Sequence, residues 1–414
     1  MWTACLGGLV ALSAAAGNLL PNPSFDRTAE PWRAAGGVAT YVPGDGRGGA
    51  GCLLVARGKE DASAWACEAG GIEAGATYLF SFWAKQMAAG GGGCIVSGPT
   101  GMNHDVNVGS EWTRCEFLFP VAPSHKGGLQ CRLGTWTKDA AVAFDDAALQ
   151  PAALFHRKVG GCVLGEGKEI SGRTYRFAAP FDSVFGAASR PLADFACGYN
   201  SNRWCFDHGS WVRYRHELGG TPFAGGRVTV QIGYHTGGTL LVEARGDGNA
   251  WVRAGAIDKL GAGELALPAE LFPARAIEVR LARGDSGPGA FQVHAYGLEA
   301  ALGTDPGAAG RGRTTFLVLE EKSDALDVAV KSLGDLVPGG ANEVALQCRA
   351  PADVSFALEY GPAGGERRAS RDAVRREGGV ALPYELAKAG AYELAIVARD
   401  AAQRVLYRAR TSFS

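Results

Sequence analysis

Short stretches in which apolar and polar residues alternate recur along most of the chain. In residues 78–85, the aromatic side chains of Tyr78, Phe80 and Phe82 occupy every second position. The same period of two recurs over residues 211–218, 227–234 and 276–281. A half-buried strand has this period because its successive side chains point to opposite faces of a sheet. The pattern therefore predicts an all-β protein built from sandwiches.

Glycine and proline divide these stretches into three segments. The 61 glycines among 414 residues are roughly twice the usual share, which is typical of many tight turns. Residues 304–312 read as a linker because they are rich in glycine and proline. We predict two jelly-roll β-sandwich domains followed by an immunoglobulin-like β-sandwich. The expected domains span residues 18–150, 151–303 and 313–414.

The first residues have the features of an export signal. An apolar stretch ends in small residues, with Ala14 and Ala16 in an A-x-A arrangement. We therefore expect a signal peptide over residues 1–16 and a protein that is secreted or held at the cell surface or in the periplasm. No later run approaches the roughly 18 apolar residues that span a bilayer, so no membrane span is expected.

Charge argues against several classes of partner. The 41 Lys and Arg residues are balanced by 42 Asp and Glu residues, and no segment is strongly basic. A protein that binds nucleic acid or a membrane surface through charge shows a basic patch. We therefore expect no nucleic-acid partner, while neutral partners such as glycans fit the balance.

Ten cysteines occur, and removal of Cys5 with the signal would leave nine, so at least one thiol stays unpaired. Cys197 and Cys205 flank a loop rich in Tyr, Asn and Trp and are the best disulfide candidates. Several others alternate with core residues and behave as small hydrophobes. No C-x-x-C pair is present, so a zinc or thioredoxin-type site has little support.

The first segment carries a family resemblance. Residues 18–26 read N-L-L-P-N-P-S-F-D, residues 78–85 read Y-L-F-S-F-W-A-K, and residues 142–149 read V-A-F-D-D-A-A-L. These motifs and their order resemble the CenC-type jelly-roll carbohydrate-binding modules, which bind cellulose, xylan and related β-glycans. The resemblance covers about 130 residues and implies a polysaccharide or cell-surface glycan as partner.

Alternation assigns candidate binding residues within this segment. A flat aromatic ring can cover the C–H face of a sugar, while Arg, Gln or Lys hydrogen-bonds its hydroxyl edge. The polar sides of two predicted strands supply such side chains: Trp83, Lys85, Gln130, Arg132 and Trp136. We expect Trp65 and a loop formed by Asn103, His104 and Asp105 to line the rim. Each tryptophan also has a plainer interpretation as a core residue.

The same resemblance implies a structural calcium ion between the first and last strands. Asp26 and Asp145 are the carboxylates at the matching positions. Calcium prefers hard oxygen ligands, several of which are often backbone carbonyls. The alternative is that the two acids are simply solvated at a sheet edge.

The second and third segments give weaker functional signals. Residues 151–303 are loosely similar to galactose-binding-like, discoidin-type sandwiches, and residues 313–414 to immunoglobulin or fibronectin domains. The aromatic and amide-rich stretch 199–209 could bind a sugar, but a hairpin loop is the plainer interpretation. No catalytic residues are predicted, because no nucleophile or metal-ligand motif is present.

Three functions remain open on the sequence. The leading hypothesis is a secreted, non-catalytic carbohydrate-binding protein that recognises a β-glycan-type polysaccharide. The first alternative is the accessory N-terminal portion of a glycoside hydrolase, which would need two carboxylates flanking a cleft. The second is an adhesion or envelope-structural protein.

Overall fold

The computed structural model describes residues 17–56, 63–88, 92–98, 102–135, 140–284, 287–307, 309–340, 342–351, 353–370 and 373–414. The chain forms two compact units. The tandem unit contains Leu20–Leu149 and His156–Arg313. The C-terminal unit contains Gln150–Phe155, Thr314–Ser414 and the described residues 17–19. The predicted signal peptide, residues 1–16, lies outside the described residues.

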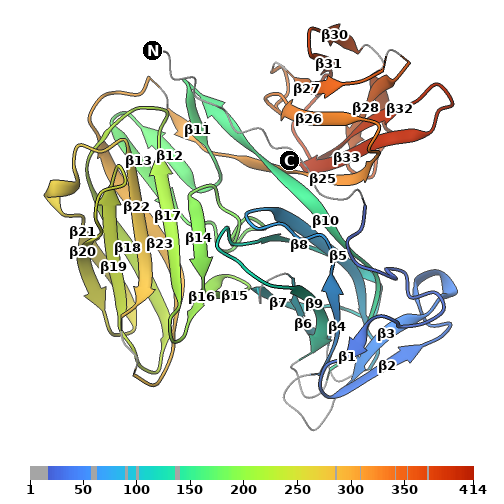
Figure 1. The fold of residues 1–414 in the computed structure, drawn as a ribbon, viewed down its shortest axis with the longest axis horizontal. Coiled ribbons are helices and arrows are strands. Elements are labelled where there is room, and N and C mark those ends of the chain that lie inside the picture. Colours follow the sequence, from blue (N-terminus) through green and yellow to red (C-terminus); the bar gives the residue numbers. More distant parts are fainter. Residues whose placement is uncertain are drawn as a thin grey trace. The chain divides into compact units, whose positions relative to one another are not determined.

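The first part of the tandem unit is a sandwich of two antiparallel sheets (Figure 1). One sheet has the order β1 (Arg33–Ala34), β4 (Ser63–Ala69), β9 (Leu129–Thr135), β6 (Gly93–Ser97) and β7 (Met102–Asn107). The other contains β2 (Val38–Val42), β3 (Cys52–Ala56), β10 (Ala141–Val159), β5 (Thr77–Gln86) and β8 (Thr113–Pro120). A short 3-10 turn, η1 (Arg47–Gly49), precedes β3.

The second part of the tandem unit is another two-sheet sandwich. Its first sheet contains β15 (Gly198–Asn200), β16 (Arg203–Phe206), β23 (Phe291–Leu302), β13 (Thr174–Ala178), β12 (Lys168–Ser171), β24 (Gly310–Arg311), β18 (Phe223–His235) and β21 (Gly261–Ala266). Its second sheet has the order β14 (Leu192–Ala196), β17 (Trp211–Glu217), β22 (Ala276–Arg283), β19 (Leu240–Gly246) and β20 (Val252–Ile257). β11 (Cys162–Leu164) pairs with β10, and η3 (Ala269–Leu271) precedes β22.

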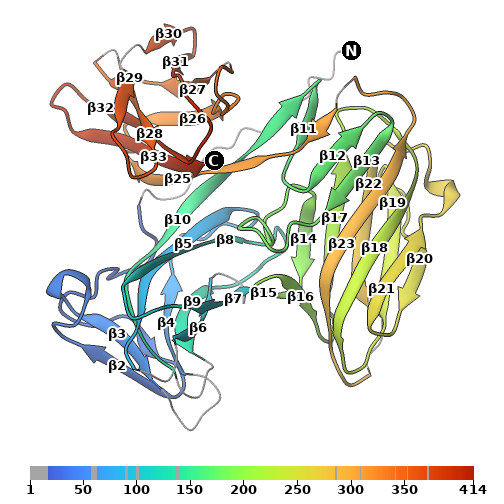
Figure 2. The ribbon, with the colours of Figure 1, turned by 180° about the vertical axis from the view of Figure 1, so that it is seen from behind.

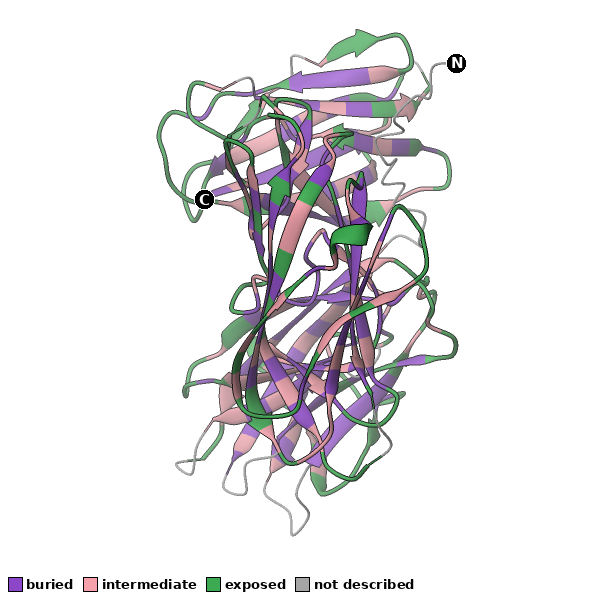
Figure 3. Ribbon diagram, turned by 90° about the vertical axis from the view of Figure 1, so that its left-hand side faces the viewer, coloured by how far each residue is buried: buried purple, intermediate pink, exposed green. Residues whose placement is uncertain are grey.

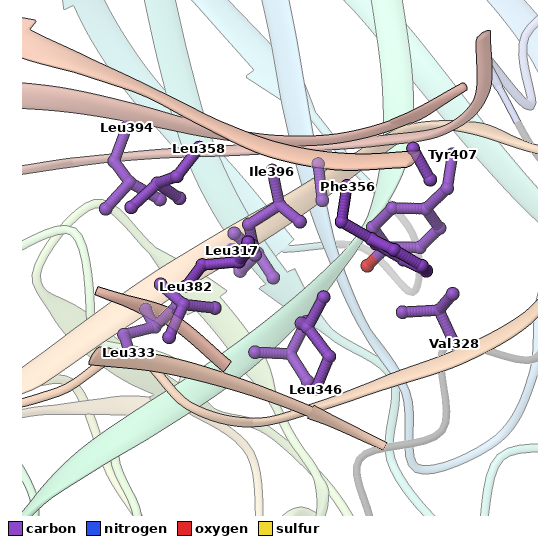
Figure 4. Packing of buried hydrophobic residues seen from close by; sticks show 14 of the residues in the cluster. Leu317, Val328, Leu333, Leu346, Phe356, Leu358, Leu382, Leu394, Ile396 and Tyr407 are labelled. Atoms are coloured by element: carbon purple, nitrogen blue, oxygen red, sulfur yellow. The ribbon is translucent and has the colours of Figure 1, made fainter. Parts of the chain in front are cut away.

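The C-terminal unit is a third sandwich. One sheet contains β25 (Thr314–Lys322), β33 (Val405–Phe413), β32 (Tyr392–Arg399), β28 (Ser355–Pro362) and β29 (Arg368–Ser370), and residues of β10 extend it beside β25. The other contains β26 (Asp327–Ser332), β27 (Glu343–Arg349), β31 (Gly379–Pro383) and β30 (Val374–Arg376). Leu317, Leu346, Phe356 and Tyr407 meet in the core between these sheets (Figure 4).

The predicted all-β fold is confirmed. Buried residues alternate with more exposed ones along many strands, which Figure 3 shows as bands of colour. Tyr78, Phe80 and Phe82 are fully buried on one face of β5, as their spacing predicts. Within the described residues, no helix is long and apolar enough to cross a membrane.

The domain boundaries inferred from composition fall within or next to β-strands and not in irregular loops. β10 runs without interruption through residues 150 and 151, where the first boundary was expected. Within the expected linker, Gly310 and Arg311 form β24 and pair with β12. That the segments divided at residues 150 and 303 fold independently of one another therefore remains a prediction.

A seam (the parallel pair β7–β15 with its flanking hydrogen bonds) joins the two sandwiches of the tandem unit into one continuous sheet. Met102 pairs with Tyr199, and Asn103 pairs with Asn200. The backbone N–H of Ser201 donates to the carbonyl of Asn103 at 2.8 Å. Figures 1 and 2 show β6, β7, β15 and β16 following one another in this sheet.

The prediction of a disulfide between Cys197 and Cys205 is wrong. Both thiols are free, as are the other seven cysteines of the described residues. The physical reason is that successive side chains of a strand point to opposite faces of the sheet. Cys197 points to the core side, as Tyr199 does. Cys205 points to the outer side, because its neighbours Trp204 and Phe206 point into the core. The two sulfur atoms therefore lie on opposite faces of the sheet.

A buried polar network crosses the core of the second sandwich. His216 is fully buried, and its two ring nitrogens lie 2.9 Å from the hydroxyl oxygens of Tyr175 and Tyr296. One hydroxyl donates to the unprotonated nitrogen and the other accepts from the N–H, so the ring is neutral. Burial, helped by the nearby Lys168, holds the pKa of His216 well below its ordinary value.

We expect the His216→Phe variant to destabilise the tandem unit at neutral pH, because each tyrosine hydroxyl left unpaired costs about 1–3 kcal/mol. The folded-state pKa is depressed, so the stability provided by neutral His216 is present above about pH 6.5 and is lost as the pH falls. Urea unfolding followed by tryptophan fluorescence measures this, since seven of the nine tryptophans lie among the described residues of the tandem unit. The difference between wild type and variant should shrink between about pH 7.5 and about pH 5; a constant difference would contradict the assignment.

Candidate functional site

Gln130 and Arg132 lie on the outer face of β9, the face that does not contact the core. Both are exposed, whereas the alternating residues Leu129, Cys131 and Leu133 are buried. This alternation is the one that the sequence predicts for a binding face.

Arg132 is held in a polar cluster with the neighbouring strands β6 and β7. Its Nε and Nη2 atoms donate to Ser97 Oγ at 3.3 and 2.9 Å, and Nη2 reaches Asn103 Oδ1 at 3.5 Å. Ser97 Oγ in turn donates to Asn103 Oδ1. Among the described residues, no carboxylate forms an ion pair with Arg132, so its positive charge faces only neutral oxygens.

The structure places Trp83 and Lys85 on the other sheet. Both lie on the outer face of β5, which pairs with β8 and β10, whereas Gln130 and Arg132 lie on β9, which pairs with β4 and β6. The outer faces of the two sheets of a sandwich point in opposite directions. A single platform containing all four side chains is therefore not formed, which corrects the sequence-based expectation.

Cations cover the aromatic rings on the β5 side. The guanidinium carbon of Arg47 lies 4.0 Å from the ring centroid of Trp83, and the Arg47 side chain also pairs with Asp146 at 2.9 Å. The ammonium of Lys85 lies 4.8 Å from the ring centroid of Trp112. A sugar that stacked on this face of Trp83 would have to displace Arg47.

Two of the four expected rim residues, Trp65 and His104, belong to the core. Asn103 and Asp105 lie on the outer face of β7, so the segment expected to be a loop is a strand. Trp65 is 7% exposed, and its Nε1 donates to the carbonyl of Leu54 on the opposite sheet at 3.1 Å. His104 stacks on Phe117 at 4.2 Å between ring centroids, and burial lowers its pKa to about 4. Both point inward because they pair with the core residues Leu133 and Val96, so neither lines a rim.

Trp136 directly follows β9 but lies outside the described residues, so its role remains a prediction. Sequence reasoning missed Ser97 and Asn103 as partners of Arg132. Asn103, Asp105 and Asn107 occupy alternate positions of β7, and this polar alternation was the signal for an outer face. Which strand β7 adjoins depends on long-range pairing that no local pattern reveals.

The stretch 199–209 contains a β-hairpin that presents different residues to each face. Tyr199 and Trp204 are buried, whereas Asn200 and Arg203 lie on the outer face. Ser201 and Asn202 form the two-residue turn, with Ser201 at a φ of 55°. The aromatic residues of the stretch are therefore core residues.

Asp26 and Asp145 come within electrostatic reach of one another. Asp145 is 1% exposed, and burial, together with the charges of Asp146 and Asp26, raises its pKa to about 6 despite backbone hydrogen bonds from Asp146 and Arg47. No group of three or more His, Cys, Asp or Glu side chains is arranged for a metal within the described residues. The two carboxylates fit the hard-oxygen chemistry of calcium, with backbone carbonyls needed to complete the ligand set.

Residues 17–129 match the family described as "Carbohydrate binding domain" (CBM_4_9). The N-terminal domain is a carbohydrate-binding-module jelly roll. Both sheets of this carbohydrate-binding module contain strands from the matched range, and Arg132 lies three residues beyond its end, in β9. No curated protein matches the chain.

Several solved structures are similar to the chain. The tandem CBM22-1–CBM22-2 domains of Paenibacillus barcinonensis Xyn10C are 12% identical, covering 70% of this chain and 100% of that one, with a TM-score of 0.29. A family 16 carbohydrate-binding module is 19% identical, covering 32% and 99%, with a TM-score of 0.28. A CBM4 structure is 18% identical, covering 32% and 99%, with a TM-score of 0.26.

The Arg47→Ala variant should expose Trp83, because it removes the guanidinium that covers the indole ring. The cation–π contact contributes only about 0.5–1 kcal/mol at such a site, so the domain should remain folded. Acrylamide quenching of tryptophan fluorescence should increase relative to wild type. The increase should disappear in the double variant Arg47→Ala/Trp83→Phe; its persistence there would show that another tryptophan had been uncovered.

Proposed function

We propose that this chain is a secreted, non-catalytic protein that captures a β-glycan-type polysaccharide through its N-terminal carbohydrate-binding module. The family match over residues 17–129 supports a carbohydrate ligand. Export is proposed on the sequence of residues 1–16 alone. The polysaccharide class rests on the resemblance of the N-terminal motifs to modules that bind β-glycans.

The observation that carries the proposal is the Arg132 cluster on the outer face of β9. An arginine held by neutral oxygens keeps donors free for further acceptors, because the guanidinium has five N–H groups. Charge-assisted hydrogen bonds of this kind are roughly twice as strong as neutral ones. Gln130, one pleat along the same face, adds amide donors and an acceptor, and Trp136 is the proposed stacking residue.

We expect Arg132→Ala to weaken glycan binding by at least about 10-fold, since a hydrogen bond to a charged group contributes ~1.5–3 kcal/mol. Trp136→Ala should also weaken binding, because it removes the proposed stacking ring. Affinity electrophoresis of the full chain in gels containing β-glucan, xylan, mannan or pectin measures the effect. Trp83→Ala is the matched aromatic variant on the opposite face and should bind like wild type.

Retardation lost in Trp83→Ala but kept in Arg132→Ala would place the binding face on β5 and overturn this assignment. A folded chain retarded by none of the polymers would favour the adhesion or envelope-structural alternative. Release of reducing sugar ends by the purified chain would favour the glycoside hydrolase alternative.

We also propose that calcium stabilises the module through Asp26 and Asp145, with backbone carbonyls as further ligands. An ion that binds only the folded state stabilises it by about 2.7 kcal/mol at a concentration of 100 times its Kd. Calcium should therefore raise the melting temperature reported by tryptophan fluorescence, and EDTA should reverse the rise. Asp145→Asn and Asp26→Asn should abolish it, while an equal rise in these variants would refute the site.

A further inference from the structure

A continuous row of polar residues crosses the seam on the outer face of the large sheet. The row follows the strand order β9, β6, β7, β15, β16 and β23. One outward side chain from each strand contributes to it: Arg132, Ser97, Asn103, Asn200, Arg203 and His294.

Register, and not proximity alone, defines this row. Arg132 pairs with Ser97, Ser97 with Asn103, Asn103 with Asn200, and Asn200 with Arg203. The antiparallel pairing of Trp204 with Val293 then places Arg203 opposite His294. Neighbouring strands lie about 4.8 Å apart, so the row extends for roughly 24 Å.

Unused hydrogen-bonding capacity remains at the seam, in the row member His294 and in Asp105 beside the row. Asp105 Oδ1 and His294 Nε2 are buried and have no hydrogen-bond partner among the described residues. Arg203 lies near both groups, and its Nη2 atom is 3.8 Å from Asp105 Oδ2. Burial is the larger cause that lowers the pKa of His294, and the positive charge of Arg203 lowers it further. Unpaired buried polar atoms are rare in folded proteins, and each calls for an explanation such as a partner that completes its hydrogen bonds.

The chemistry of the row suits a neutral, hydroxyl-rich polymer. Arg203 is partly balanced by Asp105, and the remaining members except Arg132 are uncharged at neutral pH or have a lowered pKa. Amides, hydroxyls and guanidinium groups donate to and accept from sugar hydroxyls without requiring charge on the ligand. The length of the row exceeds the reach of a single sugar, so an extended chain is the fitting occupant.

We propose that the second sandwich is part of the carbohydrate site: an extended neutral β-glycan lies along the row from Arg132 across the seam to Arg203 and His294. This inference rests on the proposed function of the module. The module holds one end of the chain, and Asn200 and Arg203 of the second sandwich hold the other. Short oligosaccharides therefore occupy the module end alone.

The test is isothermal titration calorimetry of the full chain with neutral oligosaccharides, from the disaccharide to the octasaccharide, of the polymer that retards it. Affinity should rise with length until the seam is spanned. Arg203→Gln and Asn200→Ala should each weaken binding of the longest oligosaccharide by about 2- to 10-fold, the range of one hydrogen bond, and leave the shortest unchanged. Arg132→Ala should weaken both.

Arg227→Gln is the matched control, because Arg227 lies on the same sheet, pairs with Glu264 and Glu299, and is outside the row. Thermal melts confirm that each variant is folded, and two independent seam substitutions guard against one that disturbs the hairpin. If Arg132→Ala weakens binding but neither seam variant does, the module binds alone and the inference fails. If wild type binds no glycan of any length, the proposed function fails with it.

Discussion

The parallel pairing of β7 with β15 is the constraint on which the arrangement of the tandem unit depends. β7 would otherwise be the open edge of the jelly roll, and an unpaired edge is a template for aggregation. The two-residue turn at Ser201 makes the pairing specific, because its N–H donates to Asn103 and its hydroxyl accepts from the N–H of Asp105. A separate contact between the two sandwiches comes from Asp194 of β14, which accepts a hydrogen bond from the Ser124 hydroxyl at 2.8 Å.

This pairing also decides which polar side chains share a surface. The sheet containing β9 continues into the second sandwich, so Arg132 and Arg203 lie on one outer face although they are far apart in sequence. The sheet containing β5 does not contain β9, so Trp83 lies on the opposite side of the module. The proposed glycan site therefore follows from sheet membership, and the aromatic content of a motif does not by itself identify it.

The buried polar and thiol groups have structural roles that fit the cores. His216 links Tyr175 and Tyr296 as a neutral ring and so completes the hydrogen bonds of both tyrosine hydroxyls in the core of the second sandwich. Seven of the nine described cysteines are buried, where they pack as small hydrophobes. Burial raises the pKa of thiols such as Cys52, to about 11, which keeps them unreactive.

The sequence by itself determined the all-β class and the core face of β5, because a period of two is a local property of each strand. Its motifs indicated the jelly-roll module through their resemblance to a known family. It also identified Gln130 and Arg132 as outward residues. It could not determine that β5 and β9 lie in different sheets, that Trp65 and His104 face the core, or that Cys197 and Cys205 face opposite ways. Those outcomes depend on which strands pair over long separations, and only the tertiary structure fixes that register.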